Sequence, residues 1–243
     1  MVTVSNLTKH FGAEGIDNIS FSIEKGSVLL IIGRSGSGKT LLLKILLGLV
    51  EPDSGEAYID RFKVSGRNRD YPQSVRKSTG VLFQNSALFD SMNVSENLRV
   101  PMQYNNEIEP ENYRDISEYM LKTVKLPGIL EKNIHELSGG MKRRVAIARA
   151  LVNNPSIIFY DEPVTGLDPM TGKSIIDLIR ELCLNRENTS VIITHDLRGF
   201  LEFADNVLLL ESGERYFFGS TEEFMKSERE LIVTYLKTAG YYE

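Results

Sequence analysis

The sequence predicts an α/β fold in which helices cover a mostly parallel β-sheet. Short apolar runs bounded by turn residues alternate with longer stretches of helical periodicity. The apolar runs are rich in β-branched or aromatic residues and show almost no polar alternation, as expected for central strands buried on both faces. Five such strands are expected, at residues 28–32, 80–83, 157–160, 191–194 and 207–210.

Two further patterns complete the expected fold. The N-terminal stretch, residues 2–24, alternates polar and apolar residues and indicates antiparallel strands that flank the main sheet. After residue 84 the strand signals stop, and helical periodicity predicts an inserted helical subdomain. We therefore expect a single domain, with its core at residues 1–84 and 154–243 and the helical subdomain at residues 85–153. Helices are expected at residues 40–49, 94–104, 112–124, 141–151 and 172–184.

The composition argues against several classes of protein. The chain has 243 residues and a net charge of −5, and this acidic balance argues against a nucleic-acid partner. The chain does not begin with a basic segment and an apolar run, and no apolar window approaches the ~20 residues that span a bilayer. We therefore expect a soluble, cytosolic protein. Its single cysteine, Cys183, lies in a Leu-rich helical stretch and is expected to be a buried, inert thiol.

Polar residues follow four of the predicted strands at the point where each strand ends. A glycine-rich loop follows the first strand, Gln84 follows the second, Asp161 and Glu162 follow the third, and His195 follows the fourth. In open α/β sheets, ligands bind at the carboxyl ends of the strands. The sequence therefore predicts a binding site at this edge of the sheet.

The glycine-rich loop has the pattern of a phosphate-binding loop, because it follows a strand and opens a helix. Its glycines let backbone amides turn toward phosphate oxygens, and the helix N-terminus adds a favourable dipole. Lys39 is suited to neutralise the β- and γ-phosphates of ATP, and the Thr40 hydroxyl is suited to ligate Mg²⁺. The loop consists of Gly33, Arg34, Ser35, Gly36, Ser37, Gly38, Lys39 and Thr40.

The residues after the other three strands suit the remaining tasks of ATP hydrolysis. Asp161, held at a strand end, is suited to fix Mg²⁺, and Glu162 to act as general base for the attacking water. Gln84 and His195 are weaker signals, because a lone Gln after a strand is usually a surface residue and a lone His usually satisfies a local hydrogen bond. On the same edge as the phosphate loop, Gln84 is suited to contact Mg²⁺ and that water, and His195 to donate a hydrogen bond to the γ-phosphate. The other two histidines, His10 and His135, have no comparable context and are expected at the surface.

A second anion-binding helix start follows Leu137. Ser138 is a good N-cap, and Gly139 and Gly140 expose backbone amides at the start of a helix, yet this helix has no lysine-bearing loop of its own. The run Lys142-Arg143-Arg144 that follows could contact nucleic acid. In an acidic chain, three such charges more often form a solvated helix face, which is the interpretation we favour.

With these motifs in this order, the sequence resembles the ATP-binding cassette (ABC) ATPases over nearly its whole length. The resemblance implies a RecA-like P-loop NTPase core with a flanking antiparallel β subdomain and an inserted α-helical subdomain. It also assigns seven elements: Phe11 as the residue that stacks on adenine, residues 33–40 as Walker A, Gln84 as the Q-loop, residues 137–141 as the signature, residues 157–162 as Walker B, Asp168 in the D-loop, and His195 as the switch histidine.

The resemblance further implies a pair of chains and a membrane partner. In this family two cassettes pair head to tail, so Ser138, Gly139 and Gly140 would complete the ATP site of a second copy, with Asp168 at the interface. The chain would power a separate membrane permease from the cytoplasmic face of the membrane. The permease is expected to dock beside residues 84–97, where the candidate contacts are Leu88, Phe89, Met92 and Val94, unless these belong to the subdomain core.

Two departures from the commonest cassette narrow the resemblance. The signature continues as Gly139-Gly-Met-Lys-Arg-Arg144, and the Q-loop region reads Leu82-Phe-Gln-Asn-Ser-Ala-Leu-Phe89. Both look like the cassettes of the Mla or mammalian-cell-entry (MCE) class, which drive lipid transport between membranes, and Leu126-Pro-Gly128 fits the same class. An MCE-type lipid-binding protein would then be a further partner. Val164 and Thr165 after Pro163 are unremarkable by comparison.

Other classes of cassette remain as alternatives. The chain could serve an importer or exporter of another substrate. A non-transport cassette acting on DNA is disfavoured, because the stretch between Walker A and the signature is too short for a long coiled coil. Ribosomal cassettes usually occur in tandem, and a sensor without turnover would be expected to lack Glu162 or His195. The helical C-terminal stretch, residues 221–243, receives no role beyond possible support of the dimer.

Overall fold

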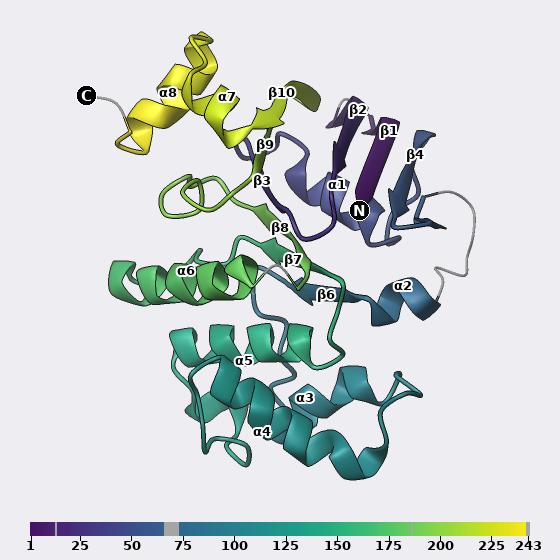
Figure 1. The fold of residues 1–243 in the computed structure, drawn as a ribbon, viewed down its shortest axis with the longest axis vertical. Helices are drawn as coiled ribbons and strands as arrows, with labels where there is room; N and C mark the ends of the chain where they lie inside the picture. The colour runs from purple at the N-terminus through teal and green to yellow at the C-terminus, as the bar shows by residue number, and fades with distance from the viewer. Residues whose placement is uncertain (13, 66–72, 186, 242–243) are drawn as a thin grey trace. The chain divides into compact units, whose positions relative to one another are not determined.

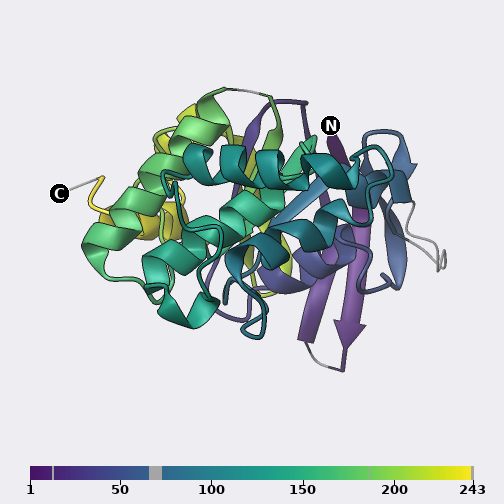
Figure 2. The same cartoon turned by 90° about the horizontal axis from the view of Figure 1, so that it is seen from below.

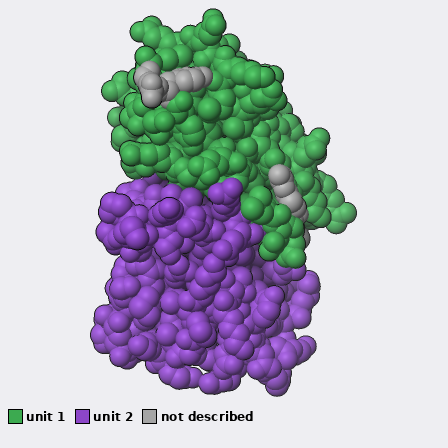
Figure 3. All heavy atoms as spheres, turned by 60° about the vertical axis from the view of Figure 1, so that its left-hand side comes forward, with its two compact units in different colours: residues 1–75, 183–243 green, residues 76–182 purple. Residues whose placement is uncertain are grey.

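The computed structural model describes residues 1–12, 14–65, 73–185 and 187–241. The chain divides into two compact units, which we call unit 1 and unit 2. Unit 1 is formed by Met1–Val75 and Cys183–Glu243, and unit 2 by Arg76–Leu182 (Figure 3). Both units combine strands with helices, which confirms the predicted α/β class.

Unit 1 contains an antiparallel sheet built on the N-terminal stretch of the chain. Antiparallel pairing of the first two strands confirms the expectation from the polar–apolar alternation. That alternation buries one face of β1, including Val2, Val4 and Leu7. Two shorter strands that we did not expect extend the sheet. The strand order is β2 (Glu14–Ile23), β1 (Val2–Phe11), β4 (Ser54–Ile59) and β5 (Phe62–Lys63).

The remaining strands of unit 1 lie in the order β10, β9, β3, β8 (Figure 1). The central strand β3 is buried at every residue and pairs in parallel with both of its neighbours. The edge strand β10 pairs antiparallel to β9, and we did not expect it. These strands are β3 (Val28–Ile32), β8 (Thr189–Ile193), β9 (Asn206–Glu211) and β10 (Glu214–Ser220), and the accompanying helices are α1 (Lys39–Leu46), α7 (Thr221–Met225) and α8 (Glu230–Thr238).

Unit 2 contains two parallel strands and a group of three mutually packed helices (Figures 1 and 2). The strands are β6 (Thr79–Leu82) and β7 (Ile157–Asp161). The packed helices are α3 (Val94–Met102), α4 (Tyr113–Thr123) and α5 (Gly139–Leu151). Two 3₁₀ turns span Pro110–Asn112 and Ile134–Glu136. Two helices contain the points where the chain passes from one unit to the other. They are α2 (Gln73–Lys77), which contains the boundary after Val75, and the longer α6 (Pro169–Leu184), which contains the boundary after Leu182.

Local capping explains where two of the unit 2 helices begin. The Asn93 side chain accepts a hydrogen bond from the Glu96 backbone amide, and the Glu96 carboxylate accepts one from the Asn93 amide, each at 2.8 Å. Ser138 caps α5 by accepting from the Met141 amide at 3.3 Å, so this helix begins two residues before the predicted start at residue 141. Each such cap stabilises a helix by about 1 kcal/mol.

Two expectations about the chain as a whole can be compared with the fold. Cys183 is 1% exposed, which confirms a buried thiol. Among the residues that the structure describes, every helix is too short or too polar to cross a lipid bilayer.

Candidate functional site

The phosphate-binding loop lies in unit 1, between β3 and α1. A side chain at Gly33 would collide with the Ser37 hydroxyl and the Leu210 carbonyl oxygen, so only glycine fits there. Gly38 has a φ of 97° and faces Ile16 at a distance that leaves no room for a Cβ atom. The predicted glycine positions therefore coincide with the places where the backbone turns most tightly.

The side chains of this loop fit a phosphate ligand. Lys39 is buried, and its ammonium donates to the carbonyl oxygens of Gly33 at 2.7 Å and Arg34 at 3.0 Å. This places a positive charge inside the loop, where phosphate oxygens need one. The Ser37 hydroxyl is buried and has no hydrogen-bond partner among the described residues, although a buried hydroxyl normally has one. Thr40 is exposed at the start of α1.

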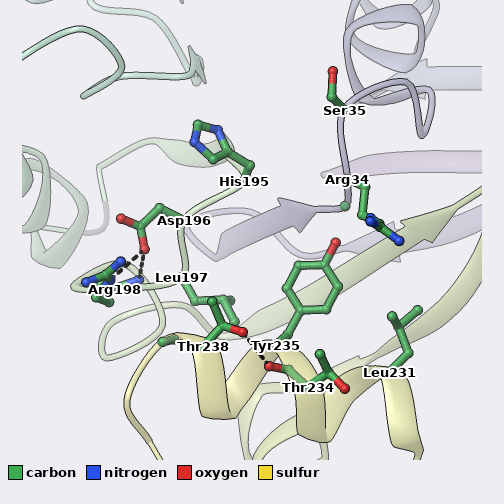
Figure 4. Close-up of a pocket in the computed structure, with 12 residues that line it drawn as sticks. Arg34, Ser35, His195, Asp196, Leu197, Arg198, Leu231, Thr234, Tyr235 and Thr238 are labelled. Atoms are coloured by element: carbon green, nitrogen blue, oxygen red, sulfur yellow. Dashed lines mark hydrogen bonds and ion pairs between the residues drawn. The ribbon is translucent and has the colours of Figure 1, made fainter.

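His195 lies close to this loop because β3 and β8 are parallel neighbours. Ile31 stands opposite Ile193, and the Thr194 amide donates to the Ile31 carbonyl at 3.1 Å. The residues that follow the two strands therefore emerge together, as the sequence predicted for this pair. A cavity of about 600 Å³ is lined by Gly33, Arg34 and Ser35 of the loop and by residues 195–198 (Figure 4).

Helix α8 forms the other wall of this cavity, a role that we did not foresee for the C-terminal stretch. The cavity is lined by Leu231, Thr234, Tyr235 and Thr238, which follow the i, i+3, i+4, i+7 spacing of a single helical face. Figure 4 shows the Tyr235 hydroxyl on the side of the ring toward Arg34. This hydroxyl is buried without a hydrogen-bond partner, and burial together with the charge of Glu211 raises its pKa. The helical spacing was the signal in the sequence that could have revealed this wall.

Phe11, the candidate for stacking on adenine, stands at the end of β1 with 57% of its side chain exposed. The Lys9 ammonium lies 5.1 Å from the centre of its ring and is fixed by an ion pair with Asp53 at 2.7 Å. The Lys9 cation and the face of the Phe11 ring attract each other, and other parts of the ring stay open to a ligand.

Unit 2 brings Gln84 and the acidic pair Asp161 and Glu162 to the same ends of two strands. The strands β6 and β7 are parallel, with Leu82 opposite Tyr160, so the residues after both strands emerge together. Gln84 is exposed, whereas Asp161 is only 7% exposed at the end of β7. This is the arrangement that the sequence predicted within this pair of strands.

Glu162 is held in a tight turn by Thr165. Glu162 has a φ of 47°, in the left-handed region that few residues other than glycine adopt. The Thr165 hydroxyl donates to the Glu162 carboxylate at 3.0 Å, and the Thr165 amide donates to the Glu162 carbonyl at 3.3 Å. Thr165 is unremarkable in the sequence, and the structure shows that this residue orients the candidate general base.

The signature residue Gly140 and Asp168 both lie next to Thr171, in the first turn of α6. A side chain at Gly140 would collide with Thr171, whereas Gly139 has only Leu167 near it. The Thr171 amide also donates to the Asp168 carboxylate at 3.0 Å. Hydrogen bonds from the Thr171 side chain and backbone hold the pKa of Asp168 below its usual value. Ser138, Gly139 and Asp168 are exposed, which leaves them accessible to a second chain.

The expectation of a solvated helix face at Lys142-Arg143-Arg144 is wrong. Arg143 is 5% exposed, and its guanidinium donates to three backbone carbonyl groups. Arg144 donates to the Val124 carbonyl at 2.8 Å. The charges were misjudged because the partners of these arginines are carbonyl oxygens and, for Arg144, also the Ser174 hydroxyl, and nothing in the sequence marks these groups as partners of a charge.

The candidate permease contacts divide into surface and core. Phe89 is 47% exposed, and Leu88 and Met92 are partly buried. Val94 is fully buried and belongs to the core of unit 2. The two alternatives that the sequence left open therefore both occur, at different residues. His10 and His135 are exposed, as expected.

Comparison with known proteins agrees with these features. The pattern of the ABC transporter family matches residues 16–165. The chain is 34% identical over 238 residues to the intermembrane phospholipid transport system ATP-binding protein MlaF of Haemophilus influenzae, covering 98% of this chain and 90% of that protein. It is 36% identical to the methionine import ATP-binding protein MetN of Carboxydothermus hydrogenoformans, covering 88% of this chain and 64% of that protein.

A solved structure extends the similarity to three dimensions. The dimeric, post-hydrolysis state of the ATP-binding cassette MJ0796, bound to ADP and phosphate, superposes with a TM-score of 0.80. The sequences are 34% identical, and the match covers 91% of this chain and 99% of that chain. The chain therefore belongs to the ABC transporter family, as one of its ATP-binding subunits. It is an ATPase, with ATP as its substrate.

Proposed function

We propose that this subunit powers lipid transport between membranes, as the ATPase of an Mla- or MCE-type system. The observation that carries the proposal is the signature Gly139-Gly-Met-Lys-Arg-Arg144, which resembles that class, together with MlaF as a relative along nearly the whole chain. The substrate would be bound by a separate permease and an MCE-type lipid-binding protein. The ATPase would work at the cytoplasmic face of the membrane.

Hydrolysis requires that ATP be held in a defined position. In our proposal Phe11 stacks on the adenine ring, and the amides of residues 33–40 surround the phosphates. The buried Lys39 ammonium balances the charge of the β- and γ-phosphates, in exchange for its contacts with the loop carbonyls. The unpartnered Ser37 hydroxyl supports this assignment, because a phosphate would satisfy it.

The chemical step belongs to the residues after β6, β7 and β8. Glu162 accepts a proton from the attacking water, in an orientation fixed by the Thr165 hydroxyl. His195 donates to the γ-phosphate, and Gln84 contacts the water. Thr40, Gln84 and Asp161 offer the hard oxygen ligands that suit Mg²⁺, which supplies positive charge to the phosphate oxygens when bound.

A second copy of the chain completes each site. The exposed Ser138 and Gly139 and the partly buried Gly140 present helix-start amides to the ATP of the partner copy, and Asp168 lies at the interface. Two observations support the pairing: the signature helix has no phosphate loop of its own, and the cassette MJ0796 is dimeric in its ADP- and phosphate-bound structure. Mixing Ser138→Arg chains with Lys39→Ala chains should leave at most one competent site per heterodimer. Unchanged ATPase rates in both single variants would rule out a shared site.

The lipid assignment is tested by reconstitution. The chain would be purified with the membrane protein encoded beside its gene and placed in vesicles that contain a fluorescent phospholipid. We expect ATP-dependent transfer of that phospholipid to acceptor vesicles, and no transfer with the Glu162→Gln variant. Radiolabelled methionine enclosed in or offered to the same vesicles is the control. Methionine movement without phospholipid transfer would overturn the assignment.

The methionine control is needed because a relative from a solute importer has a similar sequence identity to this chain. The methionine importer subunit is 36% identical to this chain, against 34% for MlaF, although the chain spans less of it. A role in the import of a small solute is therefore the second candidate. The vesicle experiment separates the two, since only a lipid transporter moves the fluorescent phospholipid.

A further inference from the structure

The most unusual buried charge in the described part of unit 2 is Arg143, in the first turns of α5. One terminal nitrogen of its guanidinium donates to the carbonyl oxygens of Phe83 at 3.1 Å and Gln84 at 2.6 Å. The other donates to the Thr165 carbonyl oxygen at 3.2 Å. One side chain thus joins the Gln84 segment to the turn that contains Glu162.

This guanidinium is held without a carboxylate partner among the described residues. All of its hydrogen bonds in that part of the chain are to backbone carbonyls, and its Nε atom has none. Burial lowers the pKa of the guanidinium, as desolvation of a cation must. Burying a charge on neutral acceptors is costly. Such a residue fits a role in positioning the two loops better than a role in filling space.

The contacts form a continuous path from the backbone of Gln84 to the carboxylate of Glu162. The path runs from the Gln84 carbonyl to Arg143 and from Arg143 to the Thr165 carbonyl. It continues from the Thr165 hydroxyl to the Glu162 carboxylate at 3.0 Å. Through these contacts, a displacement of the Gln84 backbone would be transmitted to Thr165 and, through its hydroxyl, to the orientation of Glu162.

A second arginine of α5 ties down the same segment. Arg149 donates to the carbonyl oxygens of Ser86 at 2.8 Å and Ala87 at 2.7 Å. Both of these residues have positive φ values, of 60° and 48°, which the surrounding contacts must maintain. The segment after β6 is therefore attached to α5 at two points, and only the Arg143 attachment also reaches the turn of Glu162.

We propose that Arg143 is a positioning residue that links the Gln84 segment to Glu162, so that the general base is aligned only when that segment is in place. This inference rests on the proposed functions of Gln84 and Glu162. Arg143 touches neither ATP nor water in this scheme. It acts through Gln84 on one side and Thr165 on the other.

The experiment compares Arg143→Lys with Thr165→Val and with the double variant, using the full chain. Lysine keeps the charge but cannot span two loops with a planar fork of donors. We expect each single change to lower kcat about tenfold, with the Kd for ATP unchanged within about twofold, because the phosphate loop is intact. The double variant should be no more than about twofold worse than either single one, because both changes interrupt the same path.

Arg144→Lys is the matched control, since Arg144 lies on the same helix and also donates to a carbonyl, that of Val124, while its other terminal nitrogen donates to the Ser174 hydroxyl and not to the turn of Glu162. Arg144→Lys should lower kcat only slightly. In a double variant with Thr165→Val, the loss of kcat should equal the product of the two single losses. A double variant of Arg143 and Thr165 whose loss equals the product of the single losses would overturn the proposal. So would an Arg143→Lys chain with normal kcat. If instead Glu162→Gln hydrolyses ATP normally, the proposed function of Glu162 fails, whatever the comparison of the single and double variants shows.

Discussion

The phosphate loop of unit 1 and the catalytic turn of unit 2 obtain their shapes by different means. The phosphate loop is shaped by local backbone constraints, chiefly Gly33 and Gly38, where no side chain fits. The catalytic turn contains no glycine between Asp161 and Thr165, and Glu162 is kept in a left-handed conformation by hydrogen bonds. In the proposed function, one loop binds phosphates with its own amides, whereas the other aims a single carboxylate.

The difference separates binding from chemistry. A loop defined by its backbone keeps its shape when distant residues change, which suits the constant task of holding phosphates. In the proposed scheme, a turn held by Thr165 and, through it, by Arg143 would respond to changes elsewhere in unit 2. That sensitivity suits a catalytic group whose activity must follow the state of a partner.

The largest expected effect, on kcat, comes from changing one residue in each of the two regions and comparing the results. Glu162→Gln should retain ATP binding and lower kcat by about 10²–10⁴-fold, because an amide cannot accept the proton of the attacking water. Lys39→Ala, in the phosphate loop, should weaken ATP binding itself. Equilibrium binding of a fluorescent ATP analogue and a phosphate-release assay distinguish the two outcomes. Normal turnover in Glu162→Gln would break the assignment of chemistry to unit 2.

The next effect tests whether the phosphate loop depends on glycine geometry. Gly33→Ala places a Cβ against the Leu210 carbonyl and should lower the free energy of unfolding by about 2–3 kcal/mol. Gly36→Ala is the control, because the space around Gly36 is open and only its φ of 81° opposes the change. It should cost about 1–2 kcal/mol. Urea unfolding of both variants measures the difference, and a Gly36→Ala chain that is the less stable of the two contradicts the argument.

A smaller effect concerns the wall that α8 contributes to the cavity beside the phosphate loop. Tyr235→Phe removes a buried hydroxyl that has no partner in the described residues, and should raise the free energy of unfolding by about 1 kcal/mol in the absence of nucleotide. A stabilised variant that also binds ATP normally would show that the wall only closes the cavity. A loss of ATP affinity would instead add this hydroxyl to the binding region. Thermal unfolding with and without ATP distinguishes these outcomes.

The smallest effect is the pH dependence of Asp168. Its pKa is lowered from 3.8 in the folded chain by the Thr171 side chain and amide. The resulting stabilisation is present above pH 3.8 and is lost as the pH falls through the lower, folded-state pKa. Thr171→Val keeps the shape and removes the hydroxyl. The variant should therefore lose less stability than the wild-type chain as the pH falls below about 3.8. An identical loss in both would show that the hydroxyl is unimportant.

The same contrast explains what could be predicted from the sequence. The phosphate loop and β3 were found because glycine spacing and a short apolar run are local signals. Thr165 was overlooked because its contact with the Glu162 carboxylate depends on the shape of the turn, and Arg143 was misjudged because its partners are backbone carbonyl groups. Those partners lie 60, 59 and 22 positions from Arg143 in the chain. Every residue has a backbone carbonyl group, so the sequence alone does not show which carbonyl oxygens will lie beside a particular side chain in the folded chain.

The edges of the fold were missed for a related reason. The strands β4 and β10 are only partly buried, so their composition lacks the continuous apolar character of β3. Their pairing is set by the neighbours they meet, which are β1 and β9. The contribution of α8 to the cavity was visible only as a helical stripe without an assigned partner.

The burial of Cys183 has a practical consequence for measuring the proposed pairing of two chains. It is the only cysteine in the sequence, and it is 1% exposed. A buried thiol reacts slowly with maleimides and other alkylating probes. A cysteine introduced at an exposed position such as Met170, which is 80% exposed just after Asp168, would therefore be labelled alone. Spin labels or dyes placed there can report the approach and separation of two chains during ATP turnover, in the otherwise unmodified protein.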